Sequence, residues 1–247
     1  MLENLEETRI SLSLLEYERD LPRRPSQRTR SESFARILKL IDSGKLYSLH
    51  IDVMRPPLIP DRSAFPIELV KQVYQEFHEK IVLEIHLMVK EPDLLVQEIS
   101  KFVQQKERRK TSMIIQCEAY GSEQEIVNTL GTIKGLGYRA GIGINLSTCF
   151  KSLTDQMIEI SDLVLVMSVP MGKGGQEYSD QATERIRDIS KRFPEKAIKV
   201  DGGINDRNTA SVAKAGAKIL VVGSFVTASR RPLDALKRLE KELTNPE

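Results

Sequence analysis

The stretch Leu49-His-Ile-Asp-Val-Met54 is a short apolar run that carries two polar side chains, two residues apart. Because alternate residues of a strand point to the same face, His50 and Asp52 project together. Two further runs have the same character, Glu84-Ile-His-Leu-Met88 and Lys199-Val-Asp-Gly-Gly-Ile204. If the three runs are strands of one barrel, polar side chains from distant parts of the chain converge on one point.

Similar apolar runs recur along the 247 residues, with amphipathic stretches between them. The runs indicate strands at Arg9–Leu15, Tyr47–Met54, Ile81–Met88, Ser112–Cys117, Arg139–Ile144, Leu163–Ser168, Ala197–Val200 and Ile219–Val222. Helical patterns include Ile67–Lys80, Asp93–Gln105, Gln124–Leu136, Asp180–Arg192, Asn208–Ala215 and Pro232–Glu242. Eight strand–helix units favour a parallel sheet closed into a barrel. We predict an α/β fold, a single (β/α)8 TIM barrel over residues 1–247.

A polar, basic segment interrupts this alternation at about residues 19–33, where prolines break the pattern. The segment follows the first strand, so we expect it at the mouth of the barrel. It is either a solvated surface loop or a lid whose arginines attract an anionic substrate. The sequence leaves both interpretations open.

The overall composition limits the classes of partner. The net charge of +2 argues against nucleic acid as the main partner, and no apolar run approaches the length of a membrane span. The acidic start lacks the basic region of a signal peptide, so we expect a cytoplasmic protein. Cys117 and Cys149 fit no zinc-binding spacing and are expected to be buried free thiols.

The converging polar residues predict a metal site. His50, Asp52, His86 and Asp201 supply two imidazoles and two carboxylates, a donor set suited to one divalent ion such as zinc, manganese, iron or cobalt. The chain has only three histidines, and two of them fall in these strands. A metal-dependent enzyme is therefore the favoured class.

Three glycine-rich turns follow the last three predicted strands: Gly172-Lys-Gly-Gly-Gln176, Gly202-Gly203 and Gly223-Ser224. Glycine allows backbone N–H groups to approach an anion closely. Barrels often bind phosphate at the loops after their last strands. The turns therefore predict a phosphate site beside the metal.

These residues together resemble one family, ribulose-phosphate 3-epimerase (pentulose-5-phosphate 3-epimerase). The resemblance spans nearly the whole chain, and the His-x-Asp-x-Met and His-x-Met motifs are its most distinctive part. The matching segments are Ser11-Leu-Ser-Leu-Leu15, Leu49–Met54, Glu84–Val89, Asp162–Met167, Gly172–Gln176, Val200–Asn205 and Gly223-Ser224.

The resemblance implies a role for each matching residue. His50, Asp52, His86 and Asp201 would bind the metal, and the two aspartates would also move protons. Ser13 would touch the substrate near the reacting carbons. The residues implied to line the site or hold the phosphate are Met54, Met88, Met167, Gly174, Gly175, Gly203, Gly223 and Ser224. The family also implies a homo-oligomer.

The chain departs from the family pattern at its rim. Arg55-Pro56 stands where the family has Asp-Gly, Lys173 replaces a phenylalanine, and Gln116 replaces a common histidine. Leu146 and Leu12 stand where prolines are usual. These changes leave the predicted metal ligands intact.

We expect a metal-dependent isomerase of carbohydrate metabolism, within the pentose phosphate pathway. It would interconvert D-ribulose 5-phosphate and D-xylulose 5-phosphate by two-aspartate proton transfer through an enediolate. The first alternative keeps this mechanism for a hexulose 6-phosphate such as D-allulose 6-phosphate, with Arg55, Lys173 and the extra segment as its motivation. The second is a barrel that binds a sugar phosphate without turning it over.

Overall fold

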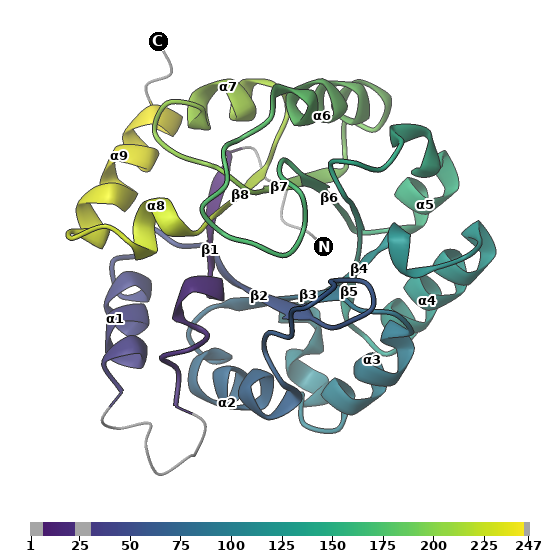
Figure 1. Cartoon of the computed structure of the whole chain (residues 1–247), viewed down its shortest axis with the longest axis horizontal. Coiled ribbons are helices and arrows are strands. Elements are labelled where there is room, and N and C mark those ends of the chain that lie inside the picture. Colours follow the sequence, from purple (N-terminus) through teal and green to yellow (C-terminus); the bar gives the residue numbers. More distant parts are fainter. Residues whose placement is uncertain (1–6, 23–30, 245–247) are drawn as a thin grey trace.

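The computed structural model describes residues 7–22 and 31–244. Its centre is a closed barrel in which eight strands are hydrogen-bonded in chain order, every pair parallel (Figure 1). The strands are β1 Arg9–Ser13, β2 Ser48–Met54, β3 Val82–Met88, β4 Thr111–Gln116, β5 Arg139–Ile144, β6 Leu163–Met167, β7 Ala197–Asp201 and β8 Ile219–Val222. The predicted (β/α)8 TIM barrel is confirmed.

A ring of helices surrounds the barrel (Figure 1). The helices are α1 Glu32–Ile41, α2 Ile67–Phe77, α3 Pro92–Ser100, α4 Glu123–Gly135, α5 Asp155–Ile160, α6 Asp180–Arg192, α7 Thr209–Lys214, α8 Ser224–Thr227 and α9 Pro232–Thr244. Short 3-10 turns are η1 Leu15–Tyr17, η3 Gln105–Lys110, η4 Cys117–Ala119 and η5 Phe150–Ser152. Helices α1, α5 and the four-residue α8 were not among those named from the sequence.

Local capping explains the starts of α1 and α5. The Ser31 hydroxyl accepts a hydrogen bond from the Phe34 N–H at the start of α1, and Thr154 caps α5 through the Met157 N–H. A side-chain oxygen at this position satisfies one of the N–H groups that the first helical turn leaves without a partner. Residues 31–33 of the expected basic segment therefore form the start of α1. Residues 23–30 of that segment lie outside the described residues.

Strand alternation separates an apolar layer from a polar interior. In β2 all seven residues are buried. Leu49, Ile51 and Val53 belong to the apolar core, whereas His50 and Asp52 lie on the alternate face with the polar site. Burial of both faces is expected for a parallel barrel, so only the chemistry of the side chains distinguishes its inside from its outside.

The strand register aligns the polar residues. Asp52 of β2 lies opposite His86 of β3, and two residues earlier His50 lies opposite Glu84. Asp201 ends β7, opposite Met167 of β6. The functional side chains thus gather near the carboxyl ends of the strands, the face on which TIM barrels place their sites.

The cysteine prediction is correct for Cys117 and wrong for Cys149. Both are free thiols, but Cys149 is exposed. It directly precedes the short turn η5 after β5 and is not part of the strand itself. Loop residues in these folds run over the surface.

Candidate active site at the carboxyl end of the barrel

A cavity of about 280 Å³ opens at the carboxyl ends of the strands. Asp52 and Asp201 reach its floor, and the loops after β6, β7 and β8 contribute its upper wall. Every residue that the resemblance assigned to the substrate lines this cavity: Ser13, Met54, Met88, Met167, Gly174, Gly175, Gly203, Gly223 and Ser224.

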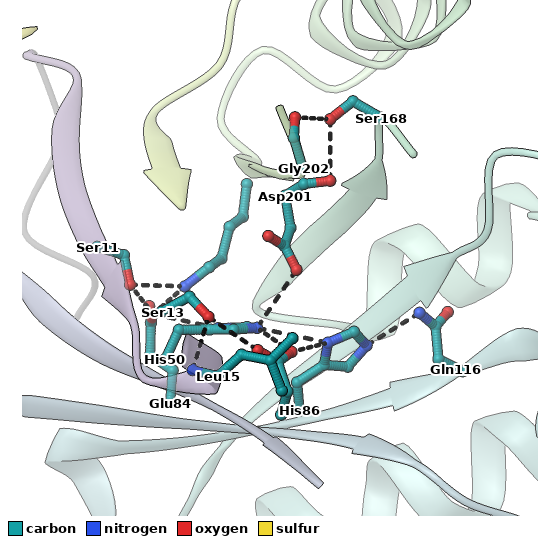
Figure 2. Close-up of polar contacts among 12 residues, drawn as sticks. Ser11, Ser13, Leu15, His50, Glu84, His86, Gln116, Ser168, Asp201 and Gly202 are labelled. Atoms are coloured by element: carbon teal, nitrogen blue, oxygen red, sulfur yellow. Dashed lines mark hydrogen bonds and ion pairs between the residues drawn. The ribbon is translucent and has the colours of Figure 1, made fainter. Parts of the chain in front are cut away.

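The four predicted metal ligands meet beneath this cavity. One nitrogen or oxygen atom from each of His50, Asp52, His86 and Asp201 lies within 4.8 Å of the other three. Asp201 comes down from β7 towards the two imidazoles, which lie side by side on the neighbouring strands β2 and β3 (Figure 2). His50 and His86 are completely buried, and Asp52 is only 3% exposed.

The distances between these donor atoms fit a small divalent ion. His50 Nε2 and His86 Nδ1 each lie 3.3 Å from Asp52 Oδ1 and 3.4 Å from each other. Asp201 Oδ2 lies 3.7 Å from His50 Nε2. Ligands bound at about 2.0–2.1 Å around a tetrahedral zinc ion are roughly 3.3–3.5 Å apart. The donor set and its spacing therefore match a metal cage.

The two aspartates have pKa values displaced in opposite directions. Burial alone would raise the pKa of Asp52, but the charges and hydrogen bonds of His50 and His86 outweigh it and hold that pKa below its ordinary value. Burial, followed by repulsion from Asp52, raises the pKa of Asp201 to about 6. Burial likewise lowers the pKa of His86, which favours the neutral imidazole that binds metal.

Gln116 supports His86 from the side away from Asp52. Gln116 Nε2 lies 2.9 Å from His86 Nε2, and the other ring nitrogen, Nδ1, is directed at the cage (Figure 2). Gly143 of β5 provides the room, because a Cβ at that position would lie 2.7 Å from Gln116 Oε1. Residues that hold the second nitrogen of a metal-binding histidine fix its tautomer and orientation. Gln116, one of the departures from the family pattern, therefore contacts a predicted metal ligand directly.

Three polar residues lower in the barrel were not singled out from the sequence. Ser11, Glu84 and Lys199 are each at most 1% exposed and contact one another. Burial lowers the pKa of Lys199, and the charges of Asp201 and Asp52 act against this shift. Their spacing in the sequence could have predicted this placement. Each residue stands two positions before a predicted site residue and therefore lies on the same strand face.

The Arg55 side chain is hydrogen-bonded to the loop that follows β2. Its guanidinium donates hydrogen bonds to the backbone carbonyls of Met54, Ala64 and Phe65, and the contact with Phe65 O is 2.9 Å. The side chain therefore fastens the segment after β2 and does not line the cavity. Of the two basic residues among the departures from the family pattern, Arg55 and Lys173, only the exposed Lys173 lines the cavity.

The glycine-rich loops approach one another closely. Gly203 has a φ of 64°, and a Cβ there would lie 2.4 Å from Tyr178 N. Within residues 7–22 and 31–244, the backbone N–H groups of Gly174, Gly175, Gly203 and Gly223 donate no hydrogen bond. These glycines line the cavity, so their N–H groups remain available to an anionic ligand.

Comparisons with known proteins agree with this geometry. Residues 30–227 match the ribulose-phosphate 3 epimerase family. The chloroplastic ribulose-5-phosphate-3-epimerase of Arabidopsis thaliana is 30% identical over 217 residues, covering 85% of this chain and 73% of the relative. The ribulose-phosphate 3-epimerase of Buchnera aphidicola from Acyrthosiphon pisum is 32% identical over 221 residues, covering 86% and 91%.

A solved structure shares the fold at low sequence identity. The 3-keto-L-gulonate-6-phosphate decarboxylase of Vibrio cholerae superposes with a TM-score of 0.66 at 10% identity, covering 96% of this chain and 98% of that one. Among the described helices, none has the length and apolar character needed to cross a bilayer. The family match extends over most of the chain and includes the strands that carry the four donor residues. The chain therefore belongs to the ribulose-phosphate 3-epimerase family, a family of isomerases.

Proposed function

We propose that this protein is a metal-dependent 3-epimerase that interconverts D-ribulose 5-phosphate and D-xylulose 5-phosphate. The observation that carries the proposal is the meeting of Asp52 and Asp201 with two buried imidazoles at the floor of one cavity. The homo-oligomeric state and the cytoplasmic location stay predictions.

The two carboxylates come from separate parts of the barrel wall. Asp52 is on β2 and Asp201 on β7, with β8 and β1 between these strands. Inverting a carbon requires a base on one face and an acid on the other, which two such carboxyl groups supply. A divalent ion in the cage would supply Lewis-acid stabilisation of the negative charge that develops when the C3 proton leaves.

Neighbouring side chains orient Asp52 and keep water away from the site. The Ser13 hydroxyl donates a 3.0 Å hydrogen bond to Asp52 Oδ2, which leaves Oδ1 facing the imidazoles. Met54, Met88 and Met167 are each at most 4% exposed and line the cavity. Their thioethers form a polarizable, water-poor wall beside the reacting carbons.

The glycine loops are the proposed phosphate site. We expect Gly203→Ala to raise the KM for the sugar phosphate by roughly 10- to 100-fold, the equivalent of one lost charge-assisted hydrogen bond. The added methyl group must displace Tyr178 and the adjoining loop. Steady-state kinetics will measure the change.

Gly44→Ala is the matched control for this substitution. Gly44 has a similar φ of 70°, but a Cβ there would meet nothing within 4 Å. Both variants should lose about 1 kcal/mol of stability from the left-handed backbone. A KM increase of equal size in both would show that backbone strain, and not the phosphate loop, is responsible.

A coupled assay tests the proposed reaction. Purified protein with added Mn²⁺ or Zn²⁺ should convert D-ribulose 5-phosphate and incorporate deuterium at C3 from deuterated water, and a chelator should abolish both. Parallel assays with D-allulose 6-phosphate determine whether the exposed Lys173 favours a longer sugar. Binding of the sugar phosphate without C3 exchange in metal-loaded protein would contradict the proposal and favour a non-catalytic barrel.

A further inference from the structure

A buried charged cluster lies in the barrel directly below the metal cage. Glu84 Oε2 accepts a 2.7 Å hydrogen bond from the Ser11 hydroxyl and forms an ion pair with Lys199 Nζ. Lys199 Nζ also donates to Ser11 Oγ at 3.3 Å. The three residues come from β1, β3 and β7 and contact one another, and Figure 2 shows Ser11 beside Glu84.

The cluster lies next to one predicted metal ligand, His50, on the side of its ring that is away from the cage. Glu84 Oε2 lies 3.8 Å from His50 Nδ1, the ring nitrogen that points away from the cage. Among the described residues, His50 Nδ1 is buried without a hydrogen-bond partner. His50 Nε2 faces Asp52 and Asp201. A carboxylate behind a metal-binding imidazole commonly accepts its second N–H and so leaves the other nitrogen free to bind the ion.

Packing alone does not explain a buried ion pair here. Removing two charges from water is costly, and apolar residues of the same volume often fill such a space equally well or better. The buried carboxylate of Glu84 is therefore best explained by its position behind the His50 imidazole. Lys199 then acts as the counter-charge that lets this carboxylate stay ionised inside the barrel.

We propose that Glu84 is a positioning residue for His50, and that Lys199 and Ser11 hold Glu84 in place. The inference rests on the proposed function, because it assumes that the cage binds a divalent ion. Neither Glu84 nor Lys199 lines the substrate cavity, so they act through His50. Their removal should affect ion binding without removing any of the four donor residues.

The main test uses Glu84→Leu combined with Lys199→Met, which replaces the ion pair by apolar side chains of similar volume. We expect this double variant to fold with an unfolding temperature at or above that of the metal-free wild type. Its affinity for zinc, measured by competition with a chromophoric chelator, should fall by about 10- to 100-fold. Such a loss in a stable protein is not expected from a merely structural pair.

Ser48→Ala is the matched control. Ser48 is completely buried on β2, two residues before His50, and its hydroxyl has no hydrogen-bond partner among the described residues. Its zinc affinity should equal that of the wild type. If the double variant also binds zinc as tightly as the wild type, the positioning role is overturned.

Glu84→Gln is the second variant, and it decides the matter if the double variant does not fold. The amide keeps the shape of the side chain and an oxygen for Ser11 and Lys199, but it loses the negative charge facing His50. Weaker zinc binding supports the proposal, whereas unchanged binding overturns it. Wild-type protein that binds no zinc would overturn the proposed function itself, a result distinct from an unaffected variant.

Discussion

Replacing Asp201 by asparagine is expected to lower kcat for epimerisation by about 10²- to 10⁴-fold, the usual contribution of a general acid or base. Asparagine keeps an oxygen beside His50, so the fold should remain. With saturating metal, Asp52 can still act on its own face of the substrate. The variant should therefore exchange the C3 hydrogen of only one of the two epimers with deuterated water, as followed by NMR.

The matched control for this variant is Asp188→Asn. Asp188 lies on α6, where its carboxylate pairs with Arg192 and is 47% exposed. Its removal should leave kcat unchanged, because Asp188 does not line the cavity. The fold should also remain, because a surface ion pair contributes little to stability. Full epimerase activity in Asp201→Asn would exclude Asp201 from proton transfer.

Zinc is expected to raise the unfolding temperature of the metal-free protein by about 5–10 °C at 100 times its dissociation constant. An ion that binds only the folded state contributes about 2.7 kcal/mol at that concentration. For a chain of this size, each 1 kcal/mol corresponds to about 2–4 °C. Differential scanning calorimetry before and after zinc addition will measure the increase.

The chain's three histidines provide a sharp comparison for this measurement. His86→Ala removes a donor atom and should reduce the zinc-induced increase to about 1 °C or less at the same zinc concentration. His78 instead stacks on Tyr74, with ring centroids 4.4 Å apart, and lies outside the cage. His78→Ala should retain the full increase, and equal increases in all three proteins would show that zinc binds elsewhere.

Much of the site could be predicted because strand alternation is a strict geometric rule. The spacing of His50 and Asp52 placed both on one strand face, and the register then brought Asp52 opposite His86. The apolar runs marked all eight strands. The polar positions within the strands and the apolar runs that mark the strands were together enough to predict the cage.

Contacts between separate loops and strands could not be predicted in the same way. The pairing of Glu84 with Lys199 joins residues 115 positions apart, and nothing in either local segment identifies the partner. The three backbone carbonyls that occupy Arg55 depend on the path of the following loop. Such contacts are set by tertiary packing and not by local periodicity.

The polar interior has a consequence for which changes in chain length the protein can tolerate. On β2, β3 and β7, each predicted metal ligand shares its strand face with the residue two positions before it. One inserted or deleted residue within such a strand would turn both polar side chains outward against the helices. The adjacent apolar residues of the strand would then point into the barrel interior. Indels should therefore accumulate in the surrounding connections, while these three strands keep a constant length.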